Sequence, residues 1–182
     1  MKEKTKQATV KSLRRYRVYH KYIGLGLALI LLISAVTGFF LGWKKNSAIL
    51  QPPTQKGQST DLTHWKSIDS LAVLAKAAFY QQYPAQADND IDRMDVRPSK
   101  GMIKVLFEKG WWEVQIDGST GSILSIDKRH SDWIEKIHDG SIISDLFKLV
   151  SMNILGLGLC IMIITGIWLW YGPKVVRKSR KK

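Results

Sequence analysis

Four histidines and one cysteine are the side chains in this sequence best suited to binding a metal ion. The histidines are His20, His64, His130 and His138, and the only cysteine is Cys160. A single cysteine allows no intrachain disulfide and no iron–sulfur or zinc–thiolate site within one chain. The sequence also lacks a Gly-x-Gly-x-x-Gly segment, a phosphate-binding loop and a recognisable Ser/His/Asp grouping. It therefore predicts no catalytic residues.

Two apolar segments determine where these histidines lie. Residues 22–43 and 149–171 carry no formal charge, and each is long enough to cross a hydrocarbon layer of roughly 30 Å as a transmembrane helix. The net charge of +13 comes from the tails 1–21 and 172–182, which are rich in Lys and Arg. Basic flanks stay cytoplasmic, so we expect both termini in the cytoplasm of a bacterial inner-membrane protein and a periplasmic central segment. Topology and contact with the lipid bilayer account for this charge, and no nucleic acid is expected as a partner.

The periplasmic segment is predicted to contain a small α+β domain. Residues 44–65 are polar and rich in turn formers, which indicates a linker. Within residues 66–127, apolar spacing predicts one helix that begins after Ser67 and stops at Tyr83. Period-two alternation after that helix predicts an antiparallel sheet. Tight turns are expected at Lys109-Gly110 and at Asp117–Gly121.

His20 lies at the cytoplasmic end of the first span and heads a strip of small residues. At 100° per residue, six small residues lie within about 80° of its direction: Gly24, Ala28, Ser34, Ala35, Gly38 and Gly42. Such a strip allows either close helix–helix contact or room for a flat cofactor beside its ligand. Gly24, one turn from His20, is where a porphyrin edge would otherwise meet a side chain. The residues alone leave both interpretations open.

Several motifs together resemble a known family. The helix, the hairpin and the segment Asp117–Leu124, Asp-Gly-x-Thr-Gly-x-Ile-Leu, resemble a PepSY domain. A PepSY domain between membrane helices resembles the PepSY-associated transmembrane (PepSY_TM) family. Residues 19–25 are similar to that family's His-Arg-Trp-x-Gly-Leu opening, and residues 134–140 to its His-x-Gly motif. Both spans end alike, in Thr37-Gly38 and in Thr165-Gly166. Larger members have additional spans and further histidines, whereas this chain is a short member with two helices.

The resemblance implies an electron-transfer protein that binds haem b and is linked to iron or siderophore reduction. It implies that His20 and His138 are metal ligands and that Gly24 makes room for the cofactor. His138 is expected in a juxtamembrane helix over residues 130–148. If that helix passes through Gly140, helical spacing places His138 on one face with Asp145, Met152, Gly156 and Cys160. His20 and His138 should then lie near opposite membrane faces, where they cannot bind one iron together. A homodimer would pair each histidine with its symmetry mate, and an external electron donor is required.

A non-enzymatic function is the alternative to electron transfer. PepSY domains elsewhere accompany peptidases, so the periplasmic domain would bind or regulate a protease or an iron-uptake membrane complex. In either case we expect that domain to bind no metal, to perform no catalysis and to serve in docking. His64 and His130 are expected at the surface. Asn153 lies inside the second span and should face another helix or a cofactor, because a polar group is costly to place in lipid.

Overall fold

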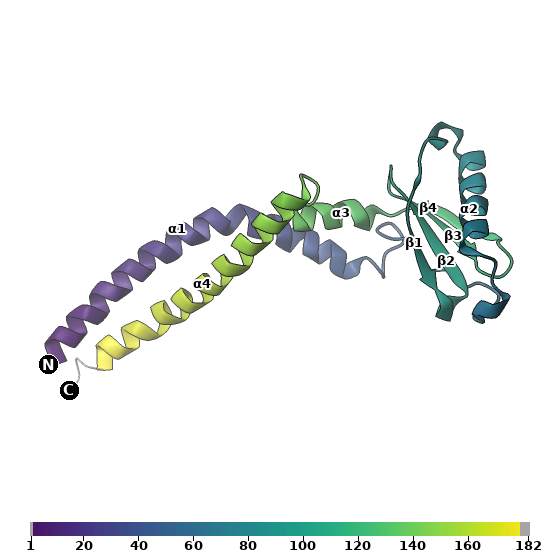
Figure 1. The fold of residues 1–182 in the computed structure, drawn as a ribbon. Coiled ribbons are helices and arrows are strands. Elements are labelled where there is room, and N and C mark those ends of the chain that lie inside the picture. Colours follow the sequence, from purple (N-terminus) through teal and green to yellow (C-terminus); the bar gives the residue numbers. More distant parts are fainter. Residues whose placement is uncertain (1, 179–182) are drawn as a thin grey trace. The chain divides into compact units, whose positions relative to one another are not determined.

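A computed structural model describes residues 2–178 of the chain, so Met1 and residues 179–182 of the two predicted tails lie outside the described residues. The helices and strands follow in the order α1 (Lys2–Trp43), α2 (Ile68–Gln82), β1 (Ile91–Arg97), β2 (Met102–Phe107), β3 (Trp112–Asp117), β4 (Ile123–Lys128), α3 (His130–Asp139) and α4 (Asp145–Lys178) (Figure 1). They form two compact units. One contains the chain up to Gly38 and from Lys136 onward, and the other is Phe39–Glu135.

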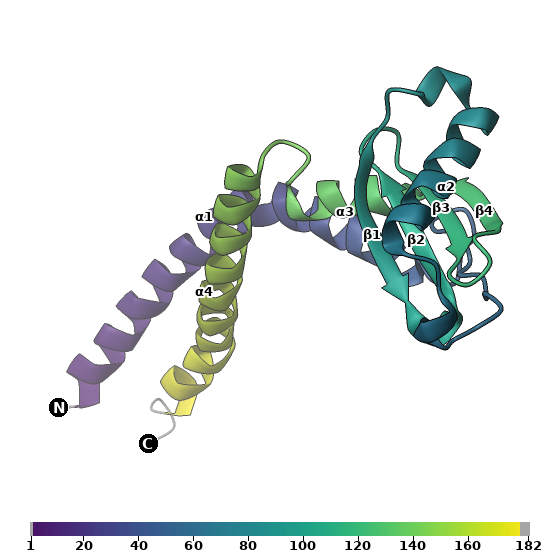
Figure 2. The ribbon, with the colours of Figure 1, turned by 45° about the vertical axis from the view of Figure 1, so that its right-hand side comes forward.

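The unit Phe39–Glu135 contains the expected helix on an antiparallel sheet. The four strands pair in the order β1-β2-β3-β4, each antiparallel to its neighbour. Helix α2 lies across one face of this sheet (Figure 2). Its residues Leu71, Ala75 and Phe79 are fully buried. They pack against the alternate apolar residues of β2 and β3: Ile103, Val105, Phe107, Val114 and Ile116. The period-two pattern therefore identified the strands and the face that the helix covers.

The ends of α2 follow the expected local chemistry. The Ser67 side chain accepts a hydrogen bond from the backbone N–H of Ser70, as an N-cap does. The helix ends at Gln82, followed by the C-cap Tyr83, whose φ of −130° and ψ of 73° leave the helical region before Pro84. Both boundaries predicted from the sequence are confirmed.

The other face of the sheet is covered by the segment that the sequence indicated to be a linker. The Gln55 backbone N–H donates to the Gln115 side-chain oxygen at 2.8 Å, and the Gln115 amide donates to the Pro53 carbonyl at 3.1 Å. The Gln58 N–H donates to the Asp117 carboxylate at 2.6 Å. Gln115 and Asp117 are almost fully buried. Residues 51–58 are therefore a second layer of the domain, because they supply the polar partners that this face needs.

The pKa of Asp117 depends on this layer. Burial by itself raises the pKa of the carboxyl group, but hydrogen bonds from Thr120, Ser119 and Gln58 outweigh burial and lower it to about 2. Ser119 donates both its backbone N–H and its hydroxyl, each at 2.8 Å. The same carboxylate thus closes the β3–β4 turn and holds residues 51–58 against the sheet.

In the other unit, α1 and α4 pack side by side as an antiparallel pair (Figure 1). Leu13 of α1 lies against Gly172 of α4, and Leu27 lies against Gly158. The contact between His20 and Thr165 lies midway between these two. Successive contacts are therefore seven residues apart in both helices. A seven-residue repeat is typical of left-handed helix packing. We call this line of contacts the helix seam.

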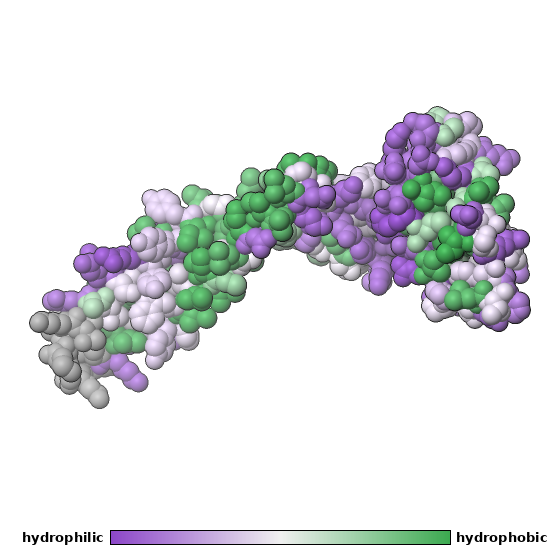
Figure 3. Space-filling view, in the orientation of Figure 1, coloured by the Kyte–Doolittle hydropathy of each residue, from purple (hydrophilic) through white to green (hydrophobic). Residues whose placement is uncertain are grey.

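The outward surfaces of α1 and α4 are apolar. Both helices are long and apolar enough to cross a membrane, as expected. Apolar side chains gather on the face of α4 that Figure 3 shows. Exposed large residues of α4 include Leu149, Ile154, Leu157, Ile163, Ile164 and Ile167. Such a surface suits lipid rather than water.

The predicted helix over residues 130–148 is wrong in one respect, because it is broken. Helix α3 ends at Asp139, and α4 begins at Asp145. Between them Gly140 has a φ of 81°, a left-handed conformation that ends a helix and favours glycine. His138 therefore does not share a continuous helical face with Asp145 and Met152.

Candidate functional site

His20 sits in the helix seam, where its ring is fixed by a threonine of α4. Its Nδ1 lies 2.8 Å from the Thr165 hydroxyl, and the His20 side chain is half-buried. That hydroxyl also lies 2.7 Å from the Ile161 carbonyl, one turn earlier in α4. A hydroxyl has one proton, and the carbonyl can only accept, so the Thr165 oxygen accepts from His20 Nδ1–H. The hydrogen-bond network thus assigns a proton to Nδ1, so that in the neutral imidazole Nε2 carries the lone pair.

His138 has the same arrangement on a different pair of elements. Its Nδ1 lies 2.9 Å from the Thr37 hydroxyl of α1. Thr37 in turn donates to the Ile33 carbonyl at 2.6 Å. By the same reasoning, His138 donates its Nδ1 proton to the Thr37 oxygen, and in the neutral ring Nε2 carries the lone pair. The Ser34 hydroxyl adds a hydrogen bond at 3.4 Å to the His138 backbone carbonyl, which fixes the end of α3.

The glycine after each threonine gives the histidine ring its space. A Cβ atom at Gly38 would lie 3.3 Å from His138 Cε1, and one at Gly166 would lie 3.5 Å from His20 Cε1. The two Thr-Gly pairs thus have equivalent roles, one toward each histidine. The sequence showed that both spans end in Thr-Gly, but not that Thr37 and Thr165 bind the histidines. Their repetition in the two spans was the available signal.

The two histidines belong to different levels of the helix pair. His20 and Thr37, the partner of His138, are 17 positions apart in one continuous helix. At 1.5 Å per residue this is about 26 Å along the axis. One metal ion cannot reach both imidazoles. The two histidines therefore occupy two separate positions along the helix pair, with one imidazole of this chain at each.

The space beside Gly24 is filled in this structure. A Cβ atom at Gly24 would lie 2.8 Å from the Met162 methyl group of α4. Gly24 thus serves here in close packing of α1 on α4. A flat group beside His20 would have to displace Met162, whose unbranched side chain has three rotatable bonds and adapts readily.

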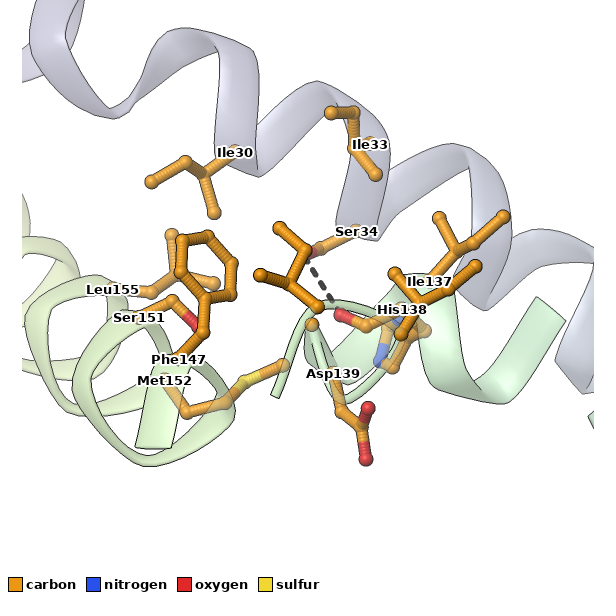
Figure 4. A pocket seen from close by; sticks show the side chains of 13 residues that line it. Ile30, Ile33, Ser34, Ile137, His138, Asp139, Phe147, Ser151, Met152 and Leu155 are labelled. Atoms are coloured by element: carbon orange, nitrogen blue, oxygen red, sulfur yellow. Dashed lines mark hydrogen bonds between the residues drawn. The ribbon is translucent and has the colours of Figure 1, made fainter. Parts of the chain in front are cut away.

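An apolar cavity of about 210 Å³ lies beside His138 (Figure 4). Ile30 and Ser34 of α1 line one side, and Phe147, Ser151 and Leu155 of α4 line another. Pockets for cofactors are commonly about 300–1,000 Å³. The cavity of a single chain is therefore too small to enclose a porphyrin, although its apolar walls suit one face of such a group.

The remaining candidate residues lie apart from these positions. His64 is exposed and lies 3.3 Å from Asp61, and His130 is also exposed, so both expected surface positions are confirmed. Asn153 is exposed on α4, and its amide donates to the Leu149 carbonyl of its own helix at 2.7 Å. Its exposed position leaves open which of its two expected partners, another helix or a cofactor, it faces. Within the described residues, no three His, Cys, Asp or Glu side chains gather as a metal site.

The fold and the surroundings of the two histidines together define the class of protein. Two helices long and apolar enough to span a membrane flank a small α+β domain in the sequence, and two histidines each contact a Thr-Gly pair. The family model described as the PepSY-associated TM region matches residues 17–182. The chain therefore belongs to the PepSY-associated TM region family. No curated protein matches the chain.

Proposed function

We propose that this chain binds haem b through His20 and His138 and carries electrons across a bacterial inner membrane, in a system that reduces iron or ferric siderophores. One observation supports this proposal above all. Each imidazole is anchored through Nδ1 to a threonine that cannot offer it a proton, which keeps Nε2 available as a ligand. Neutral imidazole with a hydrogen-bonded second nitrogen is the form in which histidine binds metals.

The threonines position the ligands in this proposal. Thr165 and Thr37 fix the ring planes of His20 and His138 and hold each Nδ1 proton in place. Such bonds also raise the basicity of the nitrogen that binds the metal. Haem iron held by histidine supplies one-electron chemistry, with a potential set by its ligands and by burial. The residues of the chain would bind the haem, hold the histidine rings in position and exclude water from the site.

A homodimer supplies the second ligand at each level. One chain offers a single histidine at each of two levels, and the cavity beside His138 is too small for a porphyrin. Two copies would form a four-helix bundle, a fold whose core can house cofactors between facing helices. The exposed amide of Asn153 favours such a partner, because its own helix satisfies only one of its polar atoms.

The basic tails support the proposed orientation, with both termini cytoplasmic and the unit Phe39–Glu135 in the periplasm. The sequence contains no Gly-x-Gly-x-x-Gly segment for a nicotinamide or flavin nucleotide. We therefore expect the electron donor to be a separate molecule, and the periplasmic domain to dock the acceptor or another partner.

Haem content tests the proposal directly. The full chain is purified in detergent, and haem per chain is measured by the pyridine haemochrome assay and by the absorption spectrum. His20→Ala and His138→Ala should each lose about half of the haem, because each removes one of two levels. His64→Ala and His130→Ala, two exposed histidines, are the matched controls and should keep it. Wild-type protein that binds no haem when supplied with it would overturn the proposal.

A further inference from the structure

A second pocket, in the unit Phe39–Glu135, is lined by positive charge. Its volume is about 420 Å³, and it lies between the segment that covers the sheet and the connection from β1 to β2. Lys45, Arg97 and Lys100 line it, and Lys104 of β2 lines it from the sheet. Neutral polar groups come from Gln51, Thr54 and Ser99, and no Asp or Glu is among its lining residues.

Two of these four cations, Lys45 and Lys100, have no carboxylate partner in the part of the chain that the structure describes. Lys104 is buried and bound to Glu113 at 3.0 Å. Among the described residues, no carboxylate lies within ion-pair distance of Lys45 or Lys100, and the nearest carboxylate to Arg97 is Asp95 at 3.7 Å. That separation is too long for a hydrogen bond. Lys45 and Lys100 therefore carry uncompensated positive charge at the pocket, and the Arg97 guanidinium keeps hydrogen-bond donors that Asp95 does not occupy.

Other cations of the same unit have close partners. Lys76 lies 2.5 Å from Asp90, Lys109 lies 2.8 Å from Asp88, and Arg129 lies 2.9 Å from Glu113. Uncompensated cations that line one concavity attract anions, because the walls focus the field.

Gln51 also lines this pocket. The side-chain oxygen of Gln51 is buried and has no hydrogen-bond partner in the structure. A buried polar atom without a partner costs free energy.

We propose that this pocket binds a multiply charged oxyanion, with its carboxylate or phosphate oxygens on Lys45, Arg97 and Lys100. Arg binds such groups with two parallel hydrogen bonds, and Lys acts as a point charge. Lys45 follows Trp43, the end of the first apolar segment, by two residues. The oxyanion can therefore be a soluble hydroxycarboxylate or phosphate, or the headgroup of an anionic lipid. The chemistry is the same for both sources, and the site is independent of haem.

The test uses the full chain in lipid nanodiscs of two compositions. In neutral phosphatidylcholine discs, citrate and inorganic phosphate are titrated by calorimetry. In a second arm, discs that contain phosphatidylglycerol report on the lipid headgroup, through the slowed dissociation of labelled lipid. The double variant Arg97→Gln/Lys100→Gln removes two charges from the pocket. Lys56→Gln/Lys66→Gln removes two charges from the same unit outside it and is the matched control.

We expect wild-type protein to bind citrate, and the pocket variant to bind it at least tenfold more weakly, about the effect of one lost charge-assisted hydrogen bond. The control variant should match the wild type. Binding of phosphatidylglycerol alone, also weakened only by the pocket variant, would support the site with a lipid as the source. No binding of any of the three probes, or equal binding by the two variants, would overturn the proposal.

Discussion

Replacing Thr165 by Val removes the hydroxyl that fixes the His20 ring while keeping the branched shape of the side chain. His20 Nδ1 then loses its acceptor at 2.8 Å. Without that acceptor, nothing in the helix seam favours the proton on Nδ1 over Nε2. We expect the two neutral tautomers to become mixed, and the fraction of chains with a free Nε2 to fall.

The size of the effect follows from two contributions. The lost hydrogen bond is partly buried, so the stability of the helix pair should fall by about 1 kcal/mol. Loss of a hydrogen bond that orients a metal ligand typically weakens metal binding by roughly 10–100-fold. The larger effect should therefore be on haem affinity and not on folding. Thr165→Ser keeps the hydroxyl and both of its bonds, so it should behave like the wild type.

Nitrogen NMR of the histidine rings measures the tautomer without any cofactor. Apo protein labelled with ¹⁵N is studied in detergent at pH 8, where an ordinary imidazole is neutral. Haem titration of the same samples gives the affinity. Thr37→Val should change only His138 and Thr165→Val only His20, so each variant is a control for the other. An unchanged His20 tautomer in Thr165→Val would refute the proton assignment. A changed tautomer with unchanged haem affinity would refute the role of Thr165 in ligation.

Three further predictions concern the seam, the sheet and the topology. Gly158→Leu should destabilise the helix pair by about 1–3 kcal/mol in thermal unfolding, because the new side chain would clash with a methyl group of Leu27. Gly156→Leu is the control and should leave the stability unchanged, because a side chain at Gly156 meets open space. The pKa of Asp117 is lowered from 3.8 to about 2. Asp117 therefore contributes about 2 kcal/mol to the free energy of unfolding at neutral pH, and this contribution is lost as the pH falls from 4 to 2. Urea unfolding of Asp117→Asn should lack that part of the pH dependence. Protease added to spheroplasts should remove the unit Phe39–Glu135, and protection of that unit would contradict the orientation.

The elements of the Phe39–Glu135 unit could be predicted from the sequence because local signals determine them. Ser67 caps α2, Tyr83 ends it before a proline, and alternation identifies β2 and β3. The layer over the second face could not be predicted. Gln115 and Asp117 alternate with apolar residues as solvent-facing side chains do, and only the folded chain shows that residues 51–58 cover them. Periodicity identifies the two faces of a strand but not what covers each face.

The candidate site, too, could be predicted from the sequence only in part. Helical geometry identified His20 and its strip of small residues, but the strip does not act as one surface. Gly24 and Gly38 meet side chains of other helices, while Ala28 and Ala35 are exposed. The seam also depends on the register of α1 against α4, which is a tertiary property. The break at Gly140 was visible only as a residue type, because glycine is tolerated inside helices as well as at their ends.

The position of His20 in the seam bears on the choice between packing and ligation. Leu13 and Leu27, seven residues to either side, fill their places against glycine without any polar atom. A leucine at position 20 would meet the same need for packing. A histidine there requires partners for two nitrogens, and Thr165 satisfies only one. Nε2 of His20 is therefore open to a ligand or to a second chain, whereas a residue selected only for packing would need no such partner.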